Sequence, residues 1–143
     1  MIVKYIVNSA RYNSVRIFNY LCDRFPKQAE NAIRYRDKHH NNSLLHNCFE
    51  LDIVRKLLYL GADINAVDND GDTPLHIVVD FGEEYIEVVK LLLDYGADTT
   101  IKNNKGKRPI DKAINNLPSE DQIIDLLNKH EEEKVDVKEP EFD

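Results

Sequence analysis

The sequence predicts an all-α fold in which short helix pairs stack side by side into an elongated solenoid. Three observations indicate this fold. One segment recurs about every 33 residues, each copy starts with signals for a turn and a helix N-terminus, and each central copy ends an amphipathic helix at a glycine. The chain has 143 residues, of which 42% are hydrophobic and 31% charged, so it has room for one domain of ordinary size.

The N-terminal segment predicts a degenerate first copy. Residues 3–11 carry apolar side chains at helical spacing, and IFNYLCDRFP (residues 17–26) aligns with IVRKLLYLGA (residues 53–62) at an offset of 36 residues. A Phe-Pro pair replaces the Gly-Ala of this alignment. Because the end units of a stack have only one neighbour, we expect both termini to be caps with more polar outer faces.

Two central copies align closely. NSLLHNCFELDIVRKLLYLGADINAVDNDG (residues 42–71) and DTPLHIVVDFGEEYIEVVKLLLDYGADTTIKNNKG (residues 72–106) share SLLH with TPLH, IVRKLL with VVKLLL and GADIN with GADTT. A third copy begins at GKRPIDKAI (residues 106–114) and continues through LPSED into the helix QIIDLLNKH, which is predicted to end near His130. The alignments predict four repeats, the outer two as caps, at residues 2–36, 37–67, 68–102 and 103–130.

Within one repeat the residues predict a turn, a helix, a second turn and a second helix. Gly71 suits a tight turn, Thr73 is an N-cap, and Pro74 occupies the first helical position, where its missing N–H costs nothing. Gly96 ends the second helix, and Arg108 replaces the cap in the third copy, so we expect that repeat to be the least firmly closed. The residues of this structural motif are Ser43, His46, Gly61, Gly71, Thr73, Pro74, His76, Gly96, Gly106 and Pro109.

The copies differ in length between their two helices. The first copy has CFELDIV there, whereas the second has the longer DFGEEYIEVV. Phe81 and Tyr85 flank this enlarged turn. An aromatic side chain at this place could anchor a partner, or it could bury the extra residues of the turn, and the second interpretation is favoured.

The net charge of −7 is concentrated at the C-terminus. Residues 131–143 hold seven acids and two lysines, a net charge of −5, which leaves −2 for residues 1–130 (17 basic minus 19 acidic). We expect residues 131–143 to be a disordered acidic tail, either a solubilising end or a short linear motif, with the former favoured. A nearly neutral body is no basic platform, so no nucleic acid is expected as a partner.

Two cysteines, Cys22 and Cys48, lie far apart within apolar helical patterns, which predicts buried thiols and no disulfide framework. The longest apolar stretches are three or four residues, so no segment is long enough to span a bilayer. The N-terminal MIVKYIV is interrupted by Lys4 and lacks the pattern of a secretory signal. We therefore expect an intracellular protein, in the cytoplasm, with no membrane partner.

The strings DNDGDTPLH (residues 68–76) and LLLDYGAD (residues 91–98) resemble the ankyrin repeat family closely. The resemblance covers roughly residues 2–130 and is strongest in the second repeat. It implies antiparallel helix pairs beside projecting β-turn loops, with loops and first helices forming a concave face that usually binds other proteins. For function it implies little beyond the binding of a partner, and we expect no cofactor.

Carried onto this sequence, the resemblance places loop tips at Lys38 to Asn42, Asp68 to Asp72 and Asn103 to Lys107. Their charges read basic, acidic, basic, which would suit a partner with complementary bands. The alternative is that the tips are simply solvated and pair with one another. The candidate partner-binding residues on the tips and first helices are His39, His40, Asn47, Glu50, Asp70, Asp72, Asp80, Phe81, Lys105, Lys107 and Arg108.

The pattern of the histidines favours a structural role over metal or acid–base chemistry. His46 and His76 recur at equivalent positions of two repeats, and in the family this histidine links the cap residue to neighbouring backbone groups. His39 and His40 with Cys48 lack the short ligand spacings of a tetrahedral zinc site. No nucleophile elbow, phosphate loop or zinc-protease motif occurs. We expect neither metal nor enzyme activity.

The functional prediction is a monomeric adaptor or inhibitor that binds another protein, of unknown identity, through the concave face. The alternative is a host-directed effector or viral ankyrin protein that sequesters a host factor, supported only by small size and Asn-, Lys-, Asp- and Ile-rich usage. One modification is also suggested. Leu57 precedes Asn65 by eight residues, as in ankyrin sequences accepted by the asparaginyl hydroxylase of the hypoxia pathway, although Asn65 also suits a plain turn role.

Overall fold

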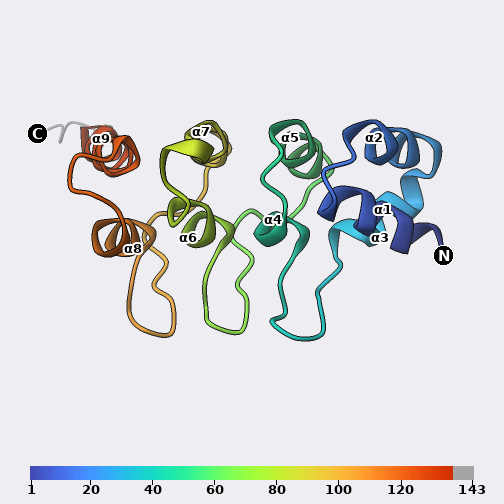
Figure 1. The fold of residues 1–143 in the computed structure, drawn as a ribbon, viewed down its shortest axis with the longest axis horizontal. Coiled ribbons are helices and arrows are strands. Elements are labelled where there is room, and N and C mark those ends of the chain that lie inside the picture. The colour runs from blue at the N-terminus through green and yellow to red at the C-terminus, as the bar shows by residue number, and fades with distance from the viewer. Residues whose placement is uncertain (137–143) are drawn as a thin grey trace, which may run out of the picture.

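The computed structural model describes residues 1–136, which form a line of stacked helices (Figure 1). One row contains α2, α5, α7 and α9, a second contains α1, α4, α6 and α8, and three loops project from the second row away from the first. This arrangement confirms the predicted all-α solenoid. The elements are α1 (Ile2–Arg11), α2 (Val15–Arg24), α3 (Pro26–Ile33), α4 (Leu44–Asn47), α5 (Leu51–Tyr59), α6 (Pro74–Val79), the 3₁₀ helix η1 (Gly82–Tyr85), α7 (Ile86–Asp94), α8 (Pro109–Asn116) and α9 (Gln122–Asp136).

A continuous apolar core runs along the stack between the two rows of helices. Every helix pair contributes to it, as the helical spacing of apolar residues predicts. Its largest fully buried apolar side chains are Phe18, Ile6, Leu44, Ile53, Leu57, Leu75, Leu92, Ile123, Leu127 and Val54. Complete burial of one such side chain stabilises the fold by about 1.5–3 kcal/mol. Because each pair shares its apolar face with its neighbours, the helices hold the projecting loops at fixed positions.

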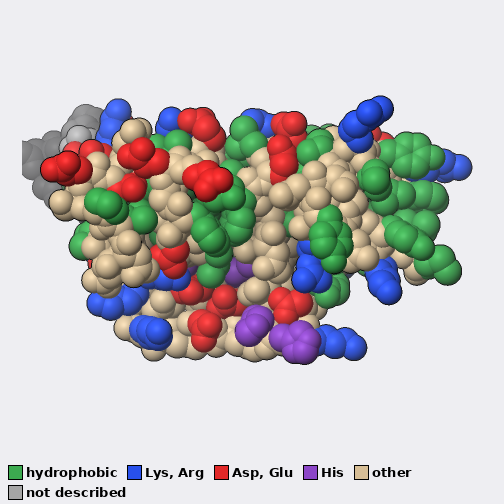
Figure 2. All heavy atoms as spheres, in the orientation of Figure 1, with side chains coloured by type: hydrophobic (Ala, Val, Ile, Leu, Met, Phe, Trp, Pro, Cys, Tyr) green, Lys and Arg blue, Asp and Glu red, His purple; other side chains and the backbone are tan. Residues whose placement is uncertain are grey.

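The N-terminal cap differs from the prediction in two ways. It contains a third helix, α3, whose first helical position is occupied by Pro26. Its outer surface is not uniformly polar: Tyr5, Ile17 and Tyr20 on α1 and α2, and Tyr12 directly after α1, are between 55% and 78% exposed. Figure 2 shows hydrophobic side chains gathered at this end of the molecule. The N-terminal cap therefore has a mixed polar and apolar surface in place of the more polar outer face that we expect from its position.

The C-terminal helix is longer than predicted. Helix α9 continues to Asp136 rather than ending near His130, so residues 131–136 are helical and the predicted start of a disordered tail at 131 is wrong. Two ion pairs accompany the extension: Glu131 lies 3.6 Å from Arg108, and Glu133 lies 4.0 Å from Lys129 one turn earlier. The rest of the predicted tail, residues 137–143, lies outside the described residues.

Candidate functional site

The three projecting loops are built by one side-chain device. Asp37, Asp68 and Asn103 begin the loops at equivalent positions, and a side-chain oxygen of each accepts backbone N–H groups further along its own loop. Asp68 accepts the N–H of residues 70 and 72 at 2.9 Å each, and Asn103 accepts those of residues 105 and 107 at 3.0 Å each. These bonds satisfy backbone N–H groups that would otherwise bind water, so each loop is held in its conformation by its own residues.

The loops are also joined to one another. The N–H of Asn69 donates to the His40 carbonyl at 2.9 Å, and the N–H of Asn104 donates to the Asp70 carbonyl at 2.9 Å. Gly71 has a φ of +76°, and a Cβ there would lie 2.7 Å from the side chain of Asn104, so only glycine permits this approach. The three loops therefore form a continuous, rigid ridge.

His46 and His76 tie the loops to the helices. Nδ1 of His46 accepts the N–H of Ser43 at 3.1 Å, and Nδ1 of His76 accepts the N–H of Thr73 at 3.1 Å. With Nδ1 as the acceptor, Nε2–H donates to the Asp72 carbonyl at 2.8 Å from His46 and to the Lys107 carbonyl at 2.9 Å from His76. Burial lowers the pKa of both imidazoles. Both histidines thus fasten one repeat to the next as neutral groups.

The third repeat closes by a different set of bonds. The Asp111 carboxylate accepts the N–H of Arg108 at 2.9 Å and also contacts its guanidinium at 3.2 Å. Asp111 has therefore taken over the bond to the helix start that the histidine makes in the other repeats. The expectation of a loosely closed third repeat is wrong at this helix start.

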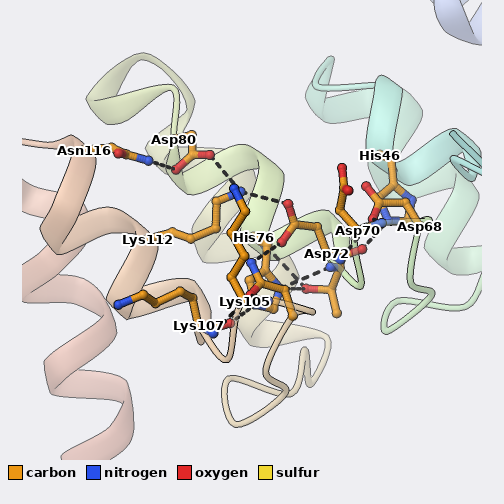
Figure 3. A network of polar contacts seen from close by, with 12 residues as sticks. His46, Asp68, Asp70, Asp72, His76, Asp80, Lys105, Lys107, Lys112 and Asn116 are labelled. Atoms are coloured by element: carbon orange, nitrogen blue, oxygen red, sulfur yellow. Dashed lines mark hydrogen bonds and ion pairs between the residues drawn. The ribbon is translucent and has the colours of Figure 1, made fainter.

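Asp72 occupies a different place from the one predicted. Its side chain is 11% exposed and lies 2.9 Å from the Nζ of Lys112, while Asn103 donates to it at 2.8 Å. Lys112 also lies 2.8 Å from Asp80, which accepts a 2.9 Å hydrogen bond from Asn116 (Figure 3). Asp72 therefore forms an internal ion pair with Lys112 of the next repeat, and it is not an exposed charge on the loop tip. The prediction missed this because its partner is 40 residues away.

The pKa values of this ion pair reflect the balance between burial and bonding. Burial alone would raise the pKa of Asp72, but hydrogen bonds from Asn103 and Lys112 outweigh it and lower the pKa. Burial alone would lower the pKa of Lys112, but its bonds to Asp80 and Asp72 outweigh that and raise the pKa. Both groups are therefore charged at neutral pH.

The remaining tip residues divide into free and engaged side chains. His39, His40, Asp70, Lys105 and Lys107 are exposed. Three other candidates have side-chain partners within the protein. Arg108 pairs with Asp111 and Glu131, Glu50 caps α5 by accepting the N–H of Asp52 at 2.9 Å, and Asn47 accepts a hydrogen bond from Asn42 at 3.3 Å.

The structure brings two of the predicted charge bands to one hollow. Asp70 on the second tip and Lys105 and Lys107 on the third line a groove of about 300 Å³, whose other wall is α8. Figure 3 shows these side chains near the buried Asp72 and the partly buried Lys112. His39 and His40 line a separate hollow beside the first loop. A carboxylate and two ammonium groups on a rigid ridge can form charge-assisted hydrogen bonds to a partner.

The enlarged turn forms an aromatic cluster that includes a residue the sequence analysis missed. The ring of Phe49 lies 5.2 Å from that of Phe81 and 5.5 Å from that of Tyr85, and the latter two rings are 5.6 Å apart. The rings therefore cover the turn, as one of the two interpretations expected, yet Phe81 stays 53% exposed. The sequence does not predict the contact of Phe49, because the inter-helix turns of the two central repeats differ in length and cannot be aligned residue by residue.

Asn65 has a structural contact in the turn after α5. Its side-chain oxygen accepts the N–H of Asp98 at 2.9 Å, which joins the ends of two neighbouring repeats. Asn65 therefore has a structural role in its own turn and also connects this turn to that of the next repeat.

The comparisons with known proteins point to one family. A family model described as ankyrin repeats, in three copies, matches residues 45–139, and a search of curated proteins finds no match. Within residues 1–136, no three His, Cys, Asp or Glu side chains gather as metal ligands, and none of these helices has the length and apolar character to cross a membrane. Ankyrin repeats are generally protein–protein interaction modules. The match covers most of the chain, and the helix pairs with their histidine-fastened loops agree with it. The chain therefore belongs to the ankyrin repeat family.

Proposed function

We propose that this ankyrin repeat protein is a non-catalytic adaptor or inhibitor that binds another protein through its concave face of loop tips and first helices. The observation that carries the proposal is the groove where Asp70 faces Lys105 and Lys107. These charges stand on a ridge whose loops are already hydrogen-bonded, so little conformational freedom is lost on binding.

The alternation of charge favours a protein over a polyanion. The exposed tips read basic at Lys38, acidic at Asp70 and basic at Lys105, and a nucleic acid or anionic membrane would be repelled by the middle band. We propose that the protein acts as a monomer in the cytoplasm without a cofactor. The same surface would serve an effector that sequesters a host factor, and the identity of the captured protein separates these two roles.

The test is affinity purification from the native cell followed by mass spectrometry, with wild type and the charge swap Asp70→Lys/Lys105→Glu. The swap leaves the net charge unchanged and alters two exposed side chains. Its matched control is Asp125→Lys/Lys129→Glu on the exposed side of α9. A partner recovered with wild type and control but lost with the charge swap supports the proposal. Equal recovery with all three proteins contradicts it.

A further inference from the structure

A second groove lies at the other end of the first helices, away from the loop tips. It has a volume of about 380 Å³ and crosses three consecutive repeats, from the end of α1 to the α4–α5 turn and to η1 and α7. Its apolar lining comes from Phe49, Leu51, Tyr85 and Val88. It is built by the part of the repeat that varies in length.

The longer turn of the second repeat creates the acidic side of this groove. The spacing from Thr73 to Arg108 is 35 residues, against 30 from Ser43 to Thr73, and the extra residues form η1. This 3₁₀ helix places Glu84 beside Tyr85 in the groove wall. A repeat with the shorter turn has no residues at this place.

The charge of the groove is uneven. Glu84 and Glu87 line it and are exposed, and Glu50 adds a third carboxylate. Glu87 pairs at the surface with Lys90 at 2.9 Å and Glu50 caps α5, whereas Glu84 makes no side-chain hydrogen bond or ion pair within residues 1–136. Figure 2 shows acidic and hydrophobic side chains together over the η1 and α7 region.

We propose that this groove binds an extended segment of a partner protein that presents arginine or lysine beside an apolar side chain. The proposal rests on the proposed protein-binding function and names the chemistry of a second contact. The apolar side chain would lie on Phe49 and Tyr85, and the cation would lie between Glu84 and Glu87.

Two neighbouring residues restrict the choice of segment. Phe81 is half-exposed at the edge of the aromatic cluster, where a guanidinium can stack on its ring. Arg11 lines the opposite end of the groove and repels a second cation there. The groove is therefore matched to a segment with one basic end, not to a uniformly basic chain.

The experiment is selection of phage-displayed random heptapeptides on immobilised full-length protein. Wild type is compared with Glu84→Lys/Glu87→Lys and with Asp125→Lys/Glu132→Lys, which makes the same charge change on α9. Wild type and control should enrich peptides with arginine or lysine next to an aliphatic or aromatic residue. The groove variant should lose this enrichment, and a selected peptide should bind it at least ten-fold more weakly by fluorescence anisotropy. Circular dichroism melting checks that all three proteins are folded.

Peptides without a basic preference, or basic peptides that bind the groove variant as well as wild type, overturn the inference. Selected peptides are also tested on Asp70→Lys/Lys105→Glu. Loss of binding only with this loop-tip variant overturns the groove assignment while the proposed function stands. If no protein partner is captured from the native cell and no peptide is enriched, the groove inference and the proposed function both fail.

Discussion

Lys112 and Asp72 form an ion pair at 2.9 Å that joins helix α8 to the loop of the preceding repeat, although 40 residues separate them in the chain. Their side chains are only 16% and 11% exposed, so the pair is shielded from solvent. Lys112 also contacts Asp80 at 2.8 Å, so one ammonium group serves two carboxylates of the second repeat. The joint between the second and third repeats therefore depends on this lysine.

Replacement of Lys112 by methionine should lower the free energy of unfolding by about 2 kcal/mol, because Asp72 keeps its charge but loses its cation. Urea denaturation at pH 7 measures the change. Lys129→Met, at an exposed position of α9, is the control and should change stability by less than about 0.5 kcal/mol. A Lys112→Met protein as stable as wild type would show that the ion pair does not hold the repeats together.

The stability of the protein should fall as the pH is lowered from 7 to 5. The pKa of an unfolded histidine is near 6.5, and burial lowers the pKa of His46 and His76 in the folded state. The unfolded chain therefore takes up protons first, so stability is complete above pH 6.5 and is lost as the pH falls below it. Urea denaturation across this range tests the sign, and His76→Gln should show a shallower dependence. Stability that rises on acidification would contradict the neutral, buried histidines.

Gly71→Ala should destabilise the protein more than Gly61→Ala. Both glycines have positive φ, +76° and +91°, so both substitutions carry a cost of about 1 kcal/mol. At Gly71 the new methyl group would also lie 2.9 Å from the backbone nitrogen of Asn104, whereas nothing lies within 4 Å at Gly61. The difference between the melting temperatures of the two variants measures the effect of the clash with Asn104. Equal melting temperatures would mean that the loops are not packed this closely.

The two thiols should be nearly unreactive in the folded protein. Burial raises the pKa of Cys22 to about 11 and that of Cys48 to about 12, so almost no thiolate is present at pH 7. A disulfide-exchange reagent should react within seconds in 6 M guanidinium chloride and only on the timescale of unfolding in buffer. Rapid reaction of either thiol with the native protein would contradict its burial.

Local signals explain which parts of the fold the sequence predicts. Gly71, Thr73 and Pro74 specify a turn and a helix start within four residues, so the central helix pairs and loops are predicted correctly. The ion pair of Asp72 depends on a residue 40 positions further along the chain, and no local pattern predicts it. Helix α3 is not predicted because Phe25 and Pro26 align with the Gly-Ala that follows the second helix of the other repeats, whereas proline is equally suited to begin a new helix.

The most direct test separates the residues that fasten the fold from those proposed to bind. The measurement is the affinity of the captured partner for wild type and for Asp70→Lys/Lys105→Glu, with the free energy of unfolding measured in parallel. If the exposed charges form the binding face, affinity falls at least ten-fold, or about 1.4 kcal/mol, while stability changes by less than about 0.5 kcal/mol. An unchanged affinity in a stably folded variant would contradict the proposed binding face.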